Sequence, residues 1–220
     1  MNMGSSDSLI LGSNLVSFLP GISAQERQRI LDCLLFCEFY AAKAVPDKKK
    51  EWERWIGMYQ RMLPVTGFIQ ATALDAPSVK VSNKKEFGRE SVKLVSRISS
   101  RGLASAAEGA LDDMLKSPHA QSFFSSWLKF DTGRSDSFQV IPCMKNRAGH
   151  IEIAVCGLQM ITRTRLKKIP TGLWPFTYEM TITVRGGVYA FDRTNYDVNR
   201  ERIEQELVEG GARITERIDL

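Results

Sequence analysis

The spacing of apolar residues changes near Asp131, and this change constrains the fold more than any other feature of the chain. Upstream, apolar side chains recur three and four positions apart, as in residues 30–39, which is typical of one face of a helix. Downstream, in residues 138–143, 151–161 and 178–191, they alternate, which is typical of strands. The sequence therefore predicts an α+β protein.

We predict an N-terminal layer of about five helices packed on a C-terminal antiparallel β meander, which one more helix closes. Residues 153–161 are apolar at nearly every position, so that strand should be covered on both faces. The predicted units are a partly flexible segment 1–22, a helical subdomain 23–130, and a sheet with its C-terminal helix, 137–220. The last two should form one cooperative unit.

Capping residues, prolines and glycines set the expected boundaries. Ser23 and Glu26 form a capping box that begins the first helix, which should end at Val45-Pro46. Asp47 is the expected N-cap of the second helix. Further helices are expected at 84–99, at 103–116, from 117 and at 196–209. Strands are expected at 68–74, 138–144, 150–169 and 177–191, the last with a bulge at 186–187, and an edge strand is expected at 212–220. The expected connections are a loop at 75–81, a linker at 131–136 and a turn at 146–149.

The overall composition is that of a soluble globular protein. The chain has 220 residues, 43% of them hydrophobic and 25% charged, with a net charge of +5, which suits a solvated surface as well as an anionic partner. The apolar stretch 9–19 lacks the basic start and cleavage site of a signal peptide. We expect a protein that is cytoplasmic as made; export that reads no N-terminal signal stays open.

The four cysteines are predicted to be buried thiols rather than a metal site or disulfides. Cys33 and Cys37 share a helical face, and no C-x-x-C pair is present. The expected turn at 146–149 places Cys143 opposite Glu152, which argues against a bridge to Cys156. We predict no metal and no cofactor.

No motif in the chain names a reaction. Nucleotide-binding glycine loops, zinc-protease helices and serine-hydrolase elbows are missing from the sequence. Carboxylate chemistry through Glu152, Glu179 and Asp192, or thiol chemistry with His150, stays an alternative. We predict no catalytic residue and favour a non-enzymatic role.

The strongest functional signal is a basic row followed by aromatic residues. In an extended strand Arg163, Arg165 and Lys167 point to one side, at intervals of about 6.6 to 7 Å. Charge and stacking of this kind suit an anionic surface or a nucleic acid, and the same row on an edge strand prevents aggregation. The residues of this predicted binding segment are Arg163, Arg165, Lys167, Lys168, Trp174 and Phe176.

Trp52 and Trp55 form an aromatic stripe on the second helix. We include both in the predicted binding surface, with packing in the core as the alternative. The hairpin 151–191 is long enough for each side to cross a bilayer.

The sequence favours a non-enzymatic binding protein that acts on a protein partner or an anionic membrane surface, with nucleic acid less favoured. One alternative is a membrane-active, pore-forming protein that uses the hairpin 151–191, which alternates as a membrane strand does. The other alternative is an enzyme with carboxylate or thiol chemistry. Assembly into a homo-oligomer stays open.

Overall fold

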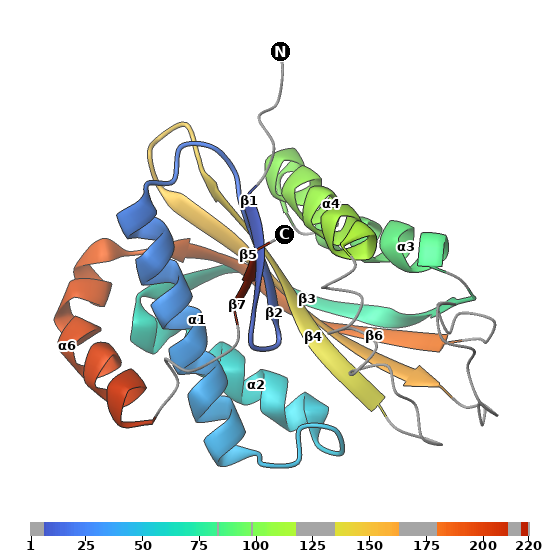
Figure 1. The fold of residues 1–220 in the computed structure, drawn as a ribbon, viewed down its shortest axis with the longest axis horizontal. Helices are drawn as coiled ribbons and strands as arrows, with labels where there is room; N and C mark the ends of the chain where they lie inside the picture. Colours follow the sequence, from blue (N-terminus) through green and yellow to red (C-terminus); the bar gives the residue numbers. More distant parts are fainter. Residues whose placement is uncertain are drawn as a thin grey trace.

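The structure, a computed structural model, describes residues 7–82, 84–97, 99–117, 135–162, 180–210 and 217–219. It has three layers, with one mixed sheet between two groups of helices (Figure 1). The predicted α+β class is confirmed, but the predicted layout is only partly right. In chain order the elements are β1 (Asp7–Leu11), β2 (Asn14–Phe18), α1 (Ala24–Ala44), α2 (Trp52–Met62), η1 (Pro64–Thr66), β3 (Phe68–Val81), α3 (Lys84–Ser96), α4 (Arg101–Lys116), β4 (Ser135–Lys145), β5 (Ile151–Thr162), β6 (Met180–Phe191), α6 (Arg193–Glu209) and β7 (Arg217–Asp219).

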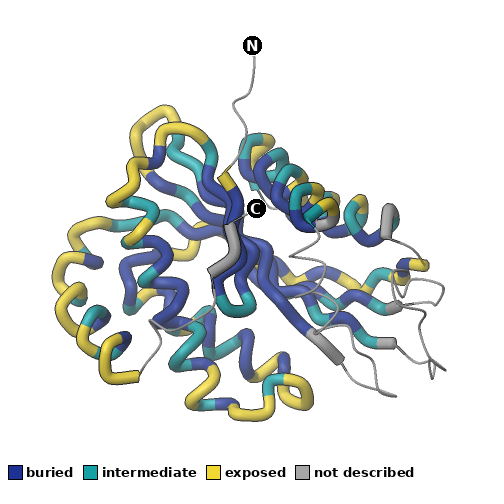
Figure 2. The backbone as a smooth tube through the Cα atoms, viewed as in Figure 1, coloured by how far each residue is buried: buried dark blue, intermediate teal, exposed yellow. Residues whose placement is uncertain are grey.

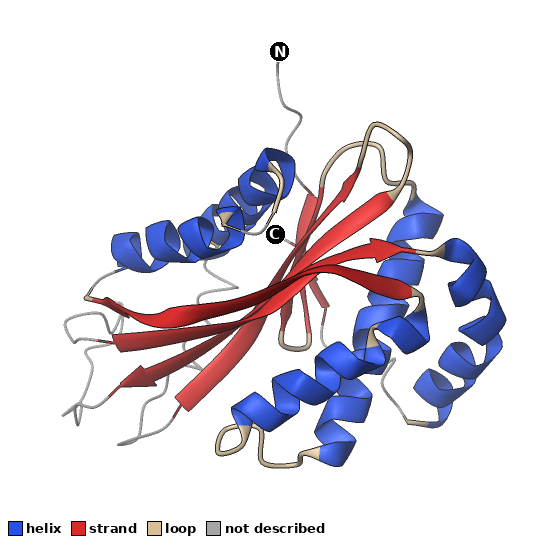
Figure 3. Ribbon diagram, turned by 180° about the vertical axis from the view of Figure 1, so that it is seen from behind, coloured by secondary structure: helices blue, strands red, loops and turns tan. Residues whose placement is uncertain are grey.

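The helices cover both faces of the sheet instead of forming one layer. Helices α1, α2 and α6 pack on one face around one apolar cluster, and α3 and α4 pack on the other around a second cluster (Figure 3). Buried residues follow the sheet and the inner sides of the helices, while the outer sides of the helices are exposed (Figure 2). The expectation that β5 is covered on both faces holds for residues 153–158, which are all buried, whereas Gln159 and Ile161 are partly exposed.

The N-terminal apolar stretch is part of the sheet, which the sequence analysis did not predict. Residues 7–18 form the hairpin β1–β2, and the strand order is β3-β6-β5-β4-β2-β1-β7. Strand β2 pairs with β4 in parallel, with Val16 opposite Ile141, whereas β4, β5 and β6 form the expected antiparallel meander. The prediction of a purely antiparallel, C-terminal sheet was wrong because helices on both faces let β1 and β2 be apolar on both sides.

Strand β3 is one continuous strand, although a short strand and a loop were expected at 68–74 and 75–81. Its pairing with β6 shifts between Ala76 and Val79, and Pro77 lies within that shift. An irregular, edge position tolerates proline because no ladder hydrogen bond needs its missing N–H.

The two adjacent glycines of β6 allow close strand packing and do not form the predicted bulge. The register is continuous at both glycines, and the nearest irregularity lies in β3 between Gln70 and Thr72, opposite Tyr189 and Val188. A Cβ at Gly186 would lie 1.8 Å from the Val155 carbonyl oxygen, and one at Gly187 would lie 2.5 Å from the Thr72 carbonyl oxygen. Neither distance leaves room for a side chain.

The predicted helix starts are partly confirmed. Ser23 and Glu26 form the capping box of α1. Helix α2 begins at Trp52, because Asp47 instead closes a turn in which its carboxylate accepts from the Lys50 amide at 3.2 Å. Within the described residues, no helix is both long and apolar enough to cross a bilayer.

The turn at 146–149, the start of the last helix and the terminal strand follow the predictions in part. The turn at 146–149 forms, with the Asn146 amide donating to the His150 carbonyl at 2.8 Å. The last helix begins at Arg193 rather than near 196, and β7 lies at one edge of the sheet, as expected for the segment 212–220. The helix expected from 117, except for Ser117 itself, and most of the linker at 131–136 lie outside the described residues.

Candidate functional site

The predicted basic and aromatic binding segment lies outside the described residues. This applies to Arg163, Arg165, Lys167, Lys168, Trp174 and Phe176, which all belong to the connection between β5 and β6. Their role in binding stays a prediction.

The two tryptophans of α2 lie in the core. Trp52 and Trp55 are each 1% exposed, and the Trp55 ring stacks on Tyr59 with 5.4 Å between the ring centroids. The Lys48 ammonium lies 3.8 Å from the Trp55 ring centroid. The core alternative therefore describes both side chains, and their contact with a partner would require α2 to leave the sheet.

The half of the sheet that leads toward this connection has one polar face. We call residues 72–81, 137–140, 157–161 and 181–185 the amphipathic half-sheet. Because directly paired residues point to the same side of a sheet, the strand registers place polar side chains together on one face, with Ile161 as an apolar exception. These polar residues are Asp75, Lys80, Ser137, Gln139, Gln159, Thr181, Thr183 and Arg185.

The opposite face of the amphipathic half-sheet is apolar. Its side chains form one buried cluster with α3 and α4. The sheet supplies Leu74, Ala76, Val81, Phe138, Val140, Leu158, Met160, Ile182 and Val184, and the helices supply Phe87, Leu94, Val95, Ala107, Ala110, Leu111 and Met114.

Helices α3 and α4 therefore act as a cover over this apolar face. The side of α4 that meets the sheet carries alanines at 106, 107 and 110, as expected from the sequence, so the helix lies close to the strands. Two polar contacts join α4 to the sheet: the Ser17 hydroxyl donates to the Ala106 carbonyl at 3.1 Å, and the Ser100 hydroxyl donates to Met144 Sδ at 3.1 Å. Most of the contact is apolar burial.

The polar face continues beneath α2. Gln139, Gly157 and Arg185 lie opposite one another on β4, β5 and β6, and the Ile56 side chain of α2 occupies the space above Gly157. Gln139 Nε2, Arg185 Nε and Trp52 Nε1 are buried without a hydrogen-bond partner within the described residues. Buried donors of this kind weaken the attachment of the covering helix.

The four cysteines are free and buried, and their environment disfavours nucleophilic chemistry. Burial raises the pKa of the Cys156 thiol to about 12, and it also raises the pKa of Cys33, Cys37 and Cys143. Cys143 lies opposite Ile153, one residue away from the expected Glu152, and Val140 lies opposite Cys156. A thiolate needs an electropositive, accessible site, which these thiols lack.

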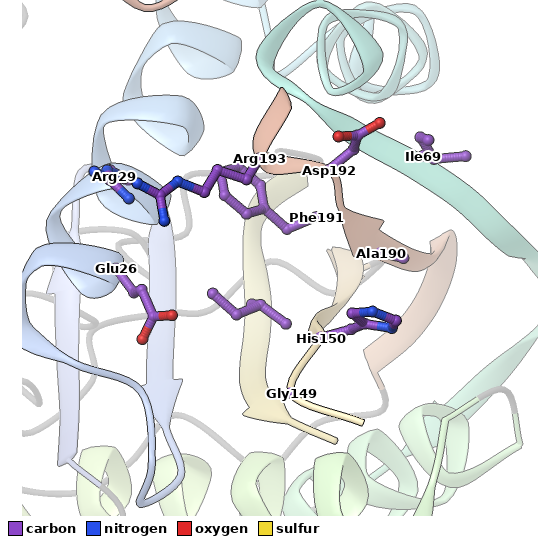
Figure 4. A pocket seen from close by; sticks show the side chains of 10 residues that line it. Glu26, Arg29, Ile69, Gly149, His150, Ala190, Phe191, Asp192 and Arg193 are labelled. Carbon is purple, nitrogen blue, oxygen red and sulfur yellow. The ribbon is translucent and has the colours of Figure 1, made fainter. Parts of the chain in front are cut away.

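A pocket opens at the other end of the sheet, where α1 and α6 begin (Figure 4). Its volume is about 470 Å³. Sequence analysis did not point to this site, because its residues come from four separate segments without a shared motif. They are Glu26, Arg29, Ile69, Gly149, His150, Ile151, Ala190, Phe191, Asp192 and Arg193.

The carboxylates considered for catalysis have local structural partners. Asp192 caps α6 by accepting from the Thr194 and Asn195 amides at 2.9 and 3.3 Å. Glu152 accepts from the Asn146 side-chain amide at 2.7 Å, and Glu179 lies outside the described residues. Asp192 and His150 do line the same pocket, but the described residues hold no group of three or more metal-ligating side chains.

Glu26, at the edge of the pocket, joins α1 to the end of β4. Lys145 Nζ donates to Glu26 Oε1 at 2.8 Å, and the Ser23 amide donates to Oε2 at 2.8 Å. The bond from Lys145 and then the bond from Ser23 lower the pKa of Glu26 from 4.5 to about 2. The folded state therefore binds this proton less readily than the unfolded state, so the stabilisation is complete above pH 4.5 and is lost as the pH falls toward 2.

Replacing this carboxylate should make the free energy of unfolding less dependent on pH in the acidic range. We expect Glu26→Gln to cost about 1 kcal/mol at pH 7, because the pair is partly exposed, and the difference from the parent should shrink as the pH falls below 4.5. Urea unfolding at several pH values measures both effects. Glu204→Gln, in the exposed pair with Arg200, is the control and should change little; a constant Glu26→Gln deficit at every pH would contradict the prediction.

Comparisons with known proteins give only weak likenesses. No family model and no curated protein matches the chain. Among solved structures, the Evf virulence factor is similar with a TM-score of 0.49 and 11% identity, covering 90% of this chain and 81% of that one. The activated Cyt2Ba monomer from Bacillus thuringiensis subsp. israelensis is similar with a TM-score of 0.47 and 11% identity, covering 81% of this chain and 95% of that one. A delta-endotoxin is similar with a TM-score of 0.45 and 11% identity, covering 83% of this chain and 85% of that one. Likenesses at this level carry no argument about function.

Proposed function

We propose that this is a membrane-active protein that inserts its amphipathic half-sheet into a bilayer after α3 and α4 leave the apolar face. The observation that carries the proposal is the division of this half-sheet into one polar face and one apolar face, which α3 and α4 cover. A sheet divided in this way can meet lipid on one side and water on the other.

The strand lengths suit this role. Strands β3, β4, β5 and β6 have 14, 11, 12 and 12 residues. A membrane strand needs about 9–11 residues when it is tilted. Each of the four whole strands reaches this length. Because the amphipathic half-sheet takes only part of each strand, crossing the hydrocarbon core would require the whole strands to insert.

Insertion also implies assembly. Strand β3 is an edge of the sheet, and an open edge in lipid leaves backbone N–H and C=O groups without partners. Several copies joined edge to edge would close the structure and place the polar faces around water. The proposal therefore includes a homo-oligomer in the membrane, which surrounds a pore.

The basic and aromatic segment 163–176 connects the ends of two of these strands, and we propose that it makes the first contact with the bilayer. Lys and Arg are attracted to anionic lipid headgroups, and Trp prefers the interface between membrane and water. A protein partner at the same segment stays an untested prediction.

A reversible cross-link between α4 and the sheet tests the proposal. In the double variant Ser100→Cys with Met144→Cys, a short, reducible bifunctional thiol reagent would join positions whose side chains now touch at 3.1 Å. The four native thiols are buried. We expect the linked protein to release no dye from vesicles of phosphatidylcholine and phosphatidylglycerol, and reduction should restore release, also at high salt, because apolar insertion is not screened.

A link within one helix is the control. Arg200→Cys with Glu204→Cys joins neighbouring turns of α6 and should leave dye release unchanged. Equal release from the linked and reduced forms of the Ser100 and Met144 variant would show that the cover does not move. No release from any vesicle by the reduced protein would remove membrane activity altogether.

A further inference from the structure

We infer that the pocket between the starts of α1 and α6 is a binding site for a phosphate group, held by Arg29 and Arg193, with His150 on the opposite side of the pocket. The inference does not depend on the proposed function, because it concerns the opposite end of the sheet. It names a ligand chemistry and a site that the amphipathic half-sheet does not include.

The side chains of the pocket that can donate hydrogen bonds to a phosphate have few partners. Within the described residues Arg29 forms no ion pair, and its guanidinium lies 5.9 Å from the Tyr196 ring centroid. Arg193 makes one long, exposed contact with Asp197 at 3.5 Å. The His150 imidazole has no hydrogen-bond partner within the described residues, whereas its backbone amide is bonded to Asn146 Oδ1 at 3.0 Å.

The negative groups of the pocket, in contrast, are already neutralised. Glu26 is paired with Lys145 at 2.8 Å. Asp192 accepts from two backbone amides of α6, where the positive end of the helix dipole compensates its charge. The two carboxylates therefore do not compete strongly for the arginines, and the charge that stays uncompensated is positive.

The arrangement of the two arginines suits an anion with several oxygens. In Figure 4 the Arg193 side chain extends toward Arg29, and His150 lies across the pocket from them. Two like charges that line one pocket, with only the long contact to Asp197 as a counter-ion within the described residues, repel each other. A phosphate relieves this repulsion, because guanidinium groups donate to it in bidentate fashion.

The remaining lining is apolar and indicates an ester rather than a bare anion. Ile151 is 5% exposed and Ile69 is 54% exposed, and Phe191 and Ala190 complete this side of the pocket. A volume of about 470 Å³ exceeds what one phosphate fills. A phosphate monoester, free in solution or in a lipid headgroup, supplies an anion for the arginines and carbon atoms for the apolar side.

Titration with phosphate compounds tests the site on the full-length protein without membranes. Inorganic phosphate and glycerol phosphate, followed by amide NMR shifts, should bind saturably and shift residues around 149–151 and 190–193. We expect Arg29→Gln to weaken binding roughly tenfold or more, because a charge-assisted hydrogen bond is lost. Arg193→Gln gives an independent reading if the first variant folds poorly, and Arg54→Gln on α2, in an exposed pair with Glu51, should bind as the parent does.

The source of the phosphate is distinguished with vesicles. If vesicles that contain phosphatidic acid bind the parent more strongly than Arg29→Gln, the ligand is a lipid headgroup; if only the soluble compounds respond to the substitution, it is a free phosphate ester. Lack of saturable phosphate binding, or binding that Arg29→Gln and Arg193→Gln both leave unchanged, would overturn the inference. Dye release by the reduced Ser100 and Met144 variant is measured separately, so the two proposals can fail independently.

Discussion

Replacing Gly186 by alanine should prevent the protein from folding. The added Cβ would lie 1.8 Å from the carbonyl oxygen of Val155 on the neighbouring strand, and backbone atoms in the middle of a sheet cannot move aside as a flexible side chain can. We expect a loss of more than about 4 kcal/mol, in the range of the most damaging single substitutions. Soluble yield and urea unfolding followed by circular dichroism measure the effect.

Gly57→Ala in α2 is the matched control. Among the described residues, no heavy atom outside the helix lies within 4 Å of where a Cβ at Gly57 would stand, and alanine is the better helix former by about 0.5–1 kcal/mol. This variant should therefore be slightly more stable than the parent. A Gly186→Ala protein with parental stability would mean that β5 and β6 do not approach each other as closely as described.

If α3 and α4 cover the inserting face as proposed, Ala110→Leu should accelerate dye release from vesicles. Ala110 is 0% exposed and faces the sheet from α4, so a larger side chain pushes the cover away from the apolar face. Overpacking costs about 1–3 kcal/mol, and each 1.4 kcal/mol lost from the cover raises the population without it about tenfold. The rate of dye release should rise by this factor, together with faster hydrogen exchange in α3 and α4.

Ala41→Leu separates this effect from a general loss of stability. Ala41 is also 0% exposed, but it lies in the cluster formed by α1, α2 and α6 on the other face. Its substitution should destabilise the protein to a similar extent without accelerating dye release. If both variants release dye equally fast, global unfolding and not departure of α3 and α4 controls permeabilisation.

The sequence predicts the antiparallel meander well because its alternation reports a local property of each strand. In β6, Ile182 and Val184 alternate with Thr181, Thr183 and Arg185, and the structure places the two sets on opposite faces. The two-sided apolar character of β5 likewise indicated cover on both faces. Patterns of this kind depend on what one segment buries, so a single sequence reveals them.

The missed elements depend on pairing between distant segments. The apolar run 9–19 has no alternation, because both faces of β1 and β2 are buried, and nothing local shows that Val16 pairs with Ile141. Pro77 made the second part of β3 look like a loop, although the register shift at that point accommodates it. Short apolar runs and prolines have several local explanations, and only the whole sheet decides among them.

The candidate sites also combine features that one segment reveals with features that depend on distant segments. The polar and apolar faces of β6 could be predicted from its alternation, whereas the cover formed by α3 and α4 could be predicted only as an apolar helix face without its partner. Arg29 and Arg193 meet in one pocket because α1 and α6 start at the same end of the sheet. That juxtaposition belongs to the topology, and the 163 residues between them carry no signal for it.

The pairing of β1 with β7 sets the order in which this chain can complete its sheet. Residues 9–11 pair with β2 within the hairpin, but their second partner strand lies at 217–219, and β2 finds its parallel partner at 139–143. During synthesis the first hairpin therefore emerges long before the strands beside it, with an apolar surface and an unpaired edge that favour aggregation. Contacts of such long range also slow folding, so the sheet can be completed only after the last residues of the described chain have been made.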